Sequence, residues 1–87
     1  MTKLIKYRKF LIIKATAREL DIAIGGEAIC DHCGCHSDMV YYIAASNKWL
    51  CPECLEEWKE TAHWYPEDAD AERKNYEFYA NRFWLKM

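Results

Sequence analysis

The sequence predicts one small α+β domain, and three observations lead to this prediction. Two C-x2-C pairs are separated by seventeen residues. A run of β-forming residues lies between the pairs, and helical patterns follow the second pair and occupy the C-terminal part of the chain. A chain of 87 residues is close to the size at which a hydrophobic core alone is sufficient, so a bound metal ion is an expected source of stability. We expect a single zinc-binding domain over residues 1–87, with its metal core at 28–62.

The cysteine pairs are the strongest signal in the chain. Cys30 and Cys33 form the first pair, and Cys51 and Cys54 form the second, at a spacing typical of four-cysteine zinc sites. Four thiolates complete a tetrahedral shell around zinc and leave no open position, so the site would be structural. Iron is the main competitor, because rubredoxin-type sites also use two C-x2-C pairs. Leu55 stands where such a site would have a glycine after the second pair, and we therefore expect one Zn²⁺ per chain rather than iron.

Three further residues near the first pair are candidate ligands, namely Cys35, His32 and His36. One of them would have to replace a paired cysteine, for instance Cys35 or His36 in place of Cys33. Residues in such positions more often donate hydrogen bonds to the ligands or face water. The prediction keeps the four paired cysteines as ligands and leaves the role of these three residues open.

A tight turn and a hairpin are predicted around the first pair. Gly34 follows Cys33 directly, and glycine allows the positive φ that a zinc knuckle requires. Residues 39–45 are rich in β-formers, 46–48 are turn residues, and 49–50 lead back toward the second pair. The resulting β-hairpin would carry the chain from one ligand pair to the other.

The second pair is predicted to open a helix. Pro52 suits the first helical position, where its missing N–H costs nothing, and residues 55–62 are helix-forming. Cys51 and Cys54 would then bind the metal from the first turn. The inner face of this helix would be formed by Leu55, Trp58 and Ala62.

The order of knuckle, hairpin and helix-borne cysteine pair resembles a treble-clef zinc finger over residues 28–62. A zinc ribbon would be expected to show a glycine after both pairs, and this chain has one only after Cys33. The flanking segments are similar to short uncharacterised zinc-finger proteins of bacteria and their phages. The resemblance implies a zinc-stabilised fold, and treble clefs often serve nucleic-acid binding.

The two flanking segments are predicted from their periodicity. Apolar residues of the N-terminal segment recur at helical intervals, at Phe10, Ile13, Ala17, Leu20 and Ile24. A strand over residues 10–13 is the alternative, and we expect a helix up to about Leu20 and an extended segment from Ile22. A C-terminal helix is expected from Asp68 to Leu85. Its apolar stripe would be formed by Ala69, Tyr76, Tyr79, Ala80 and Phe83.

Charge is unevenly distributed along the chain. The formal net charge is −2, but residues 1–18 hold six basic residues and no acidic one. An acidic chain is a poor non-specific binder of nucleic acid, although a local basic face remains. The sequence shows no secretory signal and no apolar run long enough to span a membrane, and paired C-x2-C motifs favour a reducing compartment. We therefore expect a soluble, cytoplasmic protein.

The predicted function is binding rather than catalysis, because no catalytic motif is present and the carboxylates are spread along helices. We expect a structural-zinc interaction module, not an enzyme, that binds another protein in a regulatory role. The alternative is a nucleic-acid-binding zinc finger that uses basic side chains of the N-terminal segment. These are Lys3, Lys6, Arg8 and Lys9, with Lys48 at the hairpin tip as support. Both a monomer and a homodimer fit the sequence.

Overall fold

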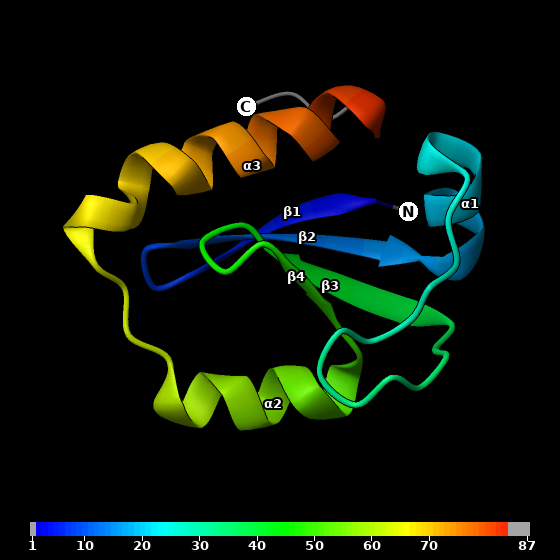
Figure 1. The fold of residues 1–87 in the computed structure, drawn as a ribbon, viewed down its shortest axis with the longest axis horizontal. Helices are drawn as coiled ribbons and strands as arrows, with labels where there is room; N and C mark the ends of the chain where they lie inside the picture. The colour runs from blue at the N-terminus through cyan, green and yellow to red at the C-terminus, as the bar shows by residue number, and fades with distance from the viewer. Residues whose placement is uncertain (1, 84–87) are drawn as a thin grey trace.

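The computed structural model describes residues 2–83 and is built on a four-stranded antiparallel sheet (Figure 1). The strands lie in chain order and are β1 (Lys3–Tyr7), β2 (Phe10–Thr16), β3 (Met39–Ile43) and β4 (Lys48–Leu50). The helices are α1 (Ala17–Ile24), α2 (Pro52–Thr61) and α3 (Ala69–Arg82), and a 3₁₀ turn, η1 (Pro66–Asp68), precedes α3. The predicted α+β class is confirmed.

The N-terminal segment differs from the prediction. β1 and β2 form a hairpin where a helix up to about Leu20 was expected, and α1 continues through Ile22, where extended chain was expected. β2 pairs with β1 on one side and with β3 on the other. Its side chains alternate between two covered faces of the sheet, so the strand is apolar on both sides. A short continuous apolar run of this kind cannot be told from a buried helix by periodicity alone.

Local signals for the start and end of α1 are nevertheless present in the sequence. Thr16 Oγ1 accepts a hydrogen bond from the N–H of Glu19 at 3.1 Å, and Glu19 Oε1 accepts one from the N–H of Thr16 at 2.9 Å. This reciprocal pair is a capping box. Gly25 ends the helix in the left-handed conformation, with a φ of 68°. The Thr-x-x-Glu pattern therefore marks the beginning of α1 better than apolar periodicity does.

α3 covers one face of the sheet and α2 covers the other, so the molecule has three layers (Figure 1). Two apolar clusters fill the spaces between the layers. The cluster under α3 includes Ile13, Ala15, Leu20, Val40, Tyr42, Trp49, Tyr76, Ala80 and Phe83. The cluster under α2 includes Phe10, Ile12, Cys30, Ile43, Leu50, Cys51, Cys54, Leu55 and Ala62. Three of the paired cysteines therefore belong to the core of the α2 layer.

Polar groups tie α3 to the sheet. Glu72 is 4% exposed, and its carboxylate accepts hydrogen bonds from the N–H of Leu11 at 3.0 Å and from Nε1–H of Trp64 at 3.1 Å. Asn75 Nδ2 donates to the carbonyl oxygen of Ala44 at 2.9 Å. These contacts fix which side of α3 faces the sheet.

The hairpin and the two later helices agree with the prediction. β3 and β4 pair antiparallel and are joined by a turn in which Asn47 has a φ of 54°. Leu55 on α2 and Ala62 directly after its last residue are buried as expected, whereas Trp58 is partly exposed. α3 lies within the predicted range, whose last residue, Leu85, is outside the described residues.

Candidate metal centre

The structure brings the four paired cysteines together. Cys30 and Cys33 lie in the loop between α1 and β3, Cys51 precedes α2, and Cys54 lies in the first turn of that helix. The four sulfur atoms all lie within 4.8 Å of one another. Cys30, Cys51 and Cys54 are buried, whereas Cys33 is exposed. Four thiols in this arrangement can hold a metal ion.

The spacing of the sulfur atoms fits a zinc ion. Cys33 Sγ lies 3.8 Å from Cys51 Sγ. Two sulfurs bound to one tetrahedral zinc at about 2.3 Å are about 3.8 Å apart, whereas a disulfide requires about 2.05 Å. The two side chains are therefore placed for metal binding and not for a disulfide, and each cysteine is a free thiol. A shell of four sulfurs is compatible with zinc.

The first ligand pair is shaped by its own backbone. Gly34 has a φ of 75°, and its N–H donates to the carbonyl oxygen of Cys30 at 2.9 Å, which closes a tight turn. The N–H of Cys33 donates to Cys30 Sγ at 3.4 Å. The N–H of Cys30 donates to the carbonyl oxygen of Cys35 at 3.0 Å, so the loop folds back on itself. The positive φ at Gly34 agrees with the prediction.

The second ligand pair is placed by the start of α2. Cys51 has an extended backbone, with φ of −74° and ψ of 165°, and Pro52 follows as the first helical residue. The N–H of Leu55 donates to the carbonyl oxygen of Cys51 at 2.9 Å. Among residues 2–83, no side chain forms a capping hydrogen bond at this end of the helix. A negatively charged thiolate centre at this position would face the positive end of the helix dipole, which stabilises it.

Asp31, which is not among the residues that the sequence singles out, holds the cysteine loop against β4. Its N–H donates to the carbonyl oxygen of Trp49 at 2.7 Å, and its carboxylate accepts a hydrogen bond from the N–H of Trp49 at 2.7 Å. These two bonds join the loop that carries Cys30 to the strand that leads into Cys51. The partner of Asp31 lies eighteen positions away, so no local pattern reveals the contact.

The thiols of the centre influence one another's ionisation. Burial raises the pKa of Cys30, but hydrogen bonds from the backbone of Cys33, Cys51 and His32 outweigh burial and lower the pKa to about 6. Burial also raises the pKa of Cys54, and the neighbouring thiols raise it further. The pKa values of these two thiols therefore shift in opposite directions, although both thiols would have to be deprotonated to bind one metal ion. Binding of a divalent cation favours the deprotonated form of each ligand and so releases protons.

The other candidate ligands lie outside the four-cysteine group. Cys35 and His36 are exposed, and Cys35 Sγ lies 4.0 Å from the carbonyl oxygen of Cys33. His32 belongs instead to a second group with Cys54 and Glu57, whose ligand atoms also lie within 4.8 Å of one another. His32 and Glu57 are far apart in the sequence, so no local pattern connects them.

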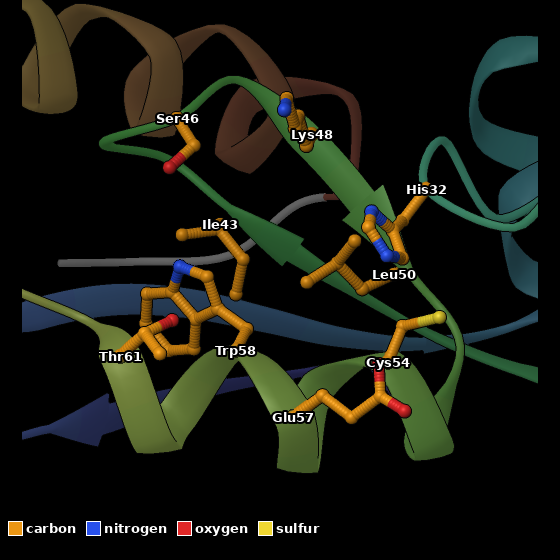
Figure 2. A pocket seen from close by; sticks show the side chains of 9 residues that line it. All are labelled: His32, Ile43, Ser46, Lys48, Leu50, Cys54, Glu57, Trp58 and Thr61. Atoms are coloured by element: carbon orange, nitrogen blue, oxygen red, sulfur yellow. The ribbon is translucent and has the colours of Figure 1, made fainter.

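A cavity of about 280 Å³ opens beside the centre, between α2 and the β3–β4 hairpin (Figure 2). Cys54 lines its end nearest to the metal centre. The apolar part of the lining is Ile43, Leu50 and Trp58, and the polar part is His32, Ser46, Lys48, Glu57 and Thr61.

No helix within residues 2–83 is long and apolar enough to cross a membrane. Comparisons of the chain with protein-family models, with curated proteins and with solved structures found no match. The function of the centre is therefore inferred from its own geometry and chemistry.

Proposed function

We propose that the chain is a structural-zinc interaction module that binds another protein in a regulatory role and has no catalytic activity. One Zn²⁺ would be held by Cys30, Cys33, Cys51 and Cys54. A closed shell of four sulfurs offers no open position to a substrate, and it contributes on the order of 10 kcal/mol of apparent folding free energy in small zinc domains. The succession of a Gly34 turn, a β-hairpin and a ligand-bearing helix supports a treble-clef arrangement.

A basic and aromatic surface at the β1–β2 turn supports the binding of a partner protein. This turn lies beside the connection from α2 to α3, at the end of α2 opposite the cysteines (Figure 1). Two adjoining hollows of about 310 and 360 Å³ open there and share four of their lining residues. We define the basic hairpin surface as Lys6, Arg8, Lys9, Phe10, His63 and Trp64.

The cations of the basic hairpin surface are available to a partner. Within residues 2–83, Lys6, Arg8 and Lys9 form no ion pair with a carboxylate. The Arg8 guanidinium lies 5.2 Å from the ring centroid of Tyr7, and the Lys9 ammonium lies 5.2 Å from that of Trp64. Arginine and tryptophan are enriched among the residues that contribute most to protein–protein affinity.

Trp64 is held in position before any partner arrives. Its Nε1–H donates to the buried carboxylate of Glu72, so little side-chain freedom is lost on binding. An acidic segment of a partner protein fits this surface, because its carboxylates match the three cations and its apolar side chains match the half-buried ring of Trp64. The net charge of −2 disfavours a long polyanion more than a local acidic segment.

The test is to identify proteins retained by the full chain and then to measure the affinity of each with purified components. The double variant Arg8→Gln, Lys9→Gln should bind the partner protein about tenfold more weakly, since each exposed charge contact is worth up to about 1 kcal/mol. The affinity of this variant should also depend less on salt concentration. Arg73→Gln with Lys74→Gln, on the exposed side of α3, is the matched control. Equal affinities for the two double variants, or a chain that retains no protein, would contradict the proposal.

Nucleic acid is the second candidate for the same surface, and the position of Lys9 over the Trp64 ring favours it. A base can stack on the indole when the Lys9 ammonium leaves that face to contact a phosphate, while Lys6 and Arg8 contact neighbouring phosphates. Three phosphate contacts on a single strand predict a slope of about −2 for the logarithm of affinity against that of salt concentration. Fluorescence anisotropy with a labelled single-stranded oligonucleotide measures this slope. Binding that the Arg8 and Lys9 variant loses would favour nucleic acid, and no binding at low salt would exclude this candidate.

A further inference from the structure

We propose that the chain binds a second divalent metal ion through His32, Cys54 and Glu57, next to the four-cysteine centre. The nitrogen, sulfur and oxygen ligand atoms of these three residues lie within 4.8 Å of one another. Figure 2 shows the three side chains at one end of the cavity between α2 and the β3–β4 hairpin. The proposal is independent of partner binding, because the basic hairpin surface lies at the other end of α2.

The local structure explains why these side chains converge. His32 stands inside the turn between Cys30 and Cys33, which must approach α2 in order to deliver both cysteines to the centre. Glu57 lies three residues after Cys54 on α2, and side chains three apart occupy one face of a helix. His32 and Glu57 are exposed, and within residues 2–83 neither side chain forms a hydrogen bond or an ion pair. Both are therefore free to turn toward a cation.

The distances between the ligand atoms fit a single ion after a small adjustment. Zinc binds imidazole nitrogen and carboxylate oxygen at about 2.0–2.2 Å and thiolate sulfur at about 2.3 Å, which places neighbouring ligands of a tetrahedral ion about 3.3–3.8 Å apart. The largest separation in the group is within 4.8 Å. Side-chain rotation that moves the ligand atoms of His32 and Glu57 by about 1 Å closes this difference. Exposed side chains change between staggered rotamers freely.

Cys54 would be shared between the two metals. A thiolate sulfur that binds one zinc ion keeps lone pairs and can bridge to a second ion. Four thiolates around one Zn²⁺ leave a formal charge of −2, and this charge attracts another cation at short range. Glu57 adds a further negative charge on the side where the second ion would bind.

The second site would differ from the first in having an open position. Three protein ligands leave the fourth position of a tetrahedral ion open, and the cavity that the three residues line has room for water or a small anion. Mixed nitrogen, oxygen and sulfur ligands suit zinc and neighbouring divalent transition metals. We expect the second ion to be held less tightly than the first, because two of its three ligands are exposed.

Native mass spectrometry of the full chain tests the proposal, with the first site loaded and Zn²⁺ then titrated. The native chain should take up two zinc ions, and His32→Asn or Glu57→Gln should take up one. Loss of a ligand should weaken the second site by at least about 100-fold, since changes outside the ligand shell already cost about 10–100-fold. His36→Asn and Glu56→Gln are matched controls, because both residues are exposed and neither belongs to the group, and they should keep two ions.

Cobalt gives a second readout that does not depend on counting ions. Co²⁺ added to the zinc-loaded chain should produce visible absorption bands of a mixed sulfur, nitrogen and oxygen site, and both ligand variants should lack these bands. All variants keep the four cysteines, so an unchanged far-UV circular dichroism spectrum shows that the fold and first centre are intact. A native chain that saturates at one zinc would overturn the proposal. So would His32 and Glu57 variants that bind a second ion as tightly as the native chain does.

Discussion

Glu72 allows a direct test of how α3 is held against the sheet. Its two carboxylate oxygens accept hydrogen bonds from the N–H of Leu11 at 3.0 Å and from Nε1–H of Trp64 at 3.1 Å. Glu72→Ala would leave both donors without an acceptor. An unsatisfied buried donor costs about 1–3 kcal/mol, so the two together predict a loss of about 2–6 kcal/mol in the free energy of unfolding. Both bonds are only partly buried, which places the expected loss in the lower half of this range.

Glu72→Gln separates hydrogen bonding from side-chain packing. The amide has the shape of the carboxylate but only one acceptor oxygen, so its NH₂ group would face one of the two donors. We expect a loss of about 1–2 kcal/mol, smaller than that of the alanine variant. Glu77→Ala is the matched control, because Glu77 is exposed on the same helix, and such a change should alter stability by less than about 0.5 kcal/mol.

Urea denaturation of the metal-loaded protein measures these differences, with tryptophan fluorescence and far-UV circular dichroism as probes. The midpoint should fall from the native chain to Glu72→Gln and then to Glu72→Ala, with little change in the dependence on urea concentration. A domain of this size is stable by roughly 5–15 kcal/mol, so the expected loss is well resolved. If Glu72→Ala costs no more than Glu77→Ala, the buried carboxylate does not hold α3 in place and the reasoning is refuted.

Two further predictions concern the core and the metal. Tyr76 is fully buried, and its hydroxyl has no hydrogen-bond partner among the described residues, so Tyr76→Phe should raise the free energy of unfolding by up to about 1 kcal/mol and the Tm by about 4–8 °C. A lower Tm for this variant would show that the hydroxyl has a partner, such as a buried water. Removal of the metal by a strong chelator should lower the stability by on the order of 10 kcal/mol and unfold the chain, and added Zn²⁺ should restore it. A chain that keeps its Tm after mass spectrometry shows loss of the metal would contradict a structural role for the ion.

The N-terminal hairpin shows where sequence-based reasoning was insufficient. Arg8 has a φ of 55° at the β1–β2 turn. A positive φ is uncommon for a residue other than glycine, so the sequence does not indicate a turn at this position. β2 is apolar on both faces because its neighbour β3, from much later in the chain, completes a sheet that helices cover on both sides. Neither fact is contained in the local pattern of residues 10–13, which suits a helix equally well.

The sequence by itself determined the grouping of Cys30, Cys33, Cys51 and Cys54 and the turn, hairpin and helix that carry them. These features depend on short-range spacing, because a glycine turn or a helix end presents side chains from only a few neighbouring residues.

Only the tertiary structure decided that Glu72 is buried against Trp64 and Leu11 and that His32 meets Glu57. A charged residue is expected at the surface unless folding brings it a partner, and each of these partners comes from a distant segment. Which polar groups meet is therefore set by how the sheet and helices pack together, not by their order along the chain.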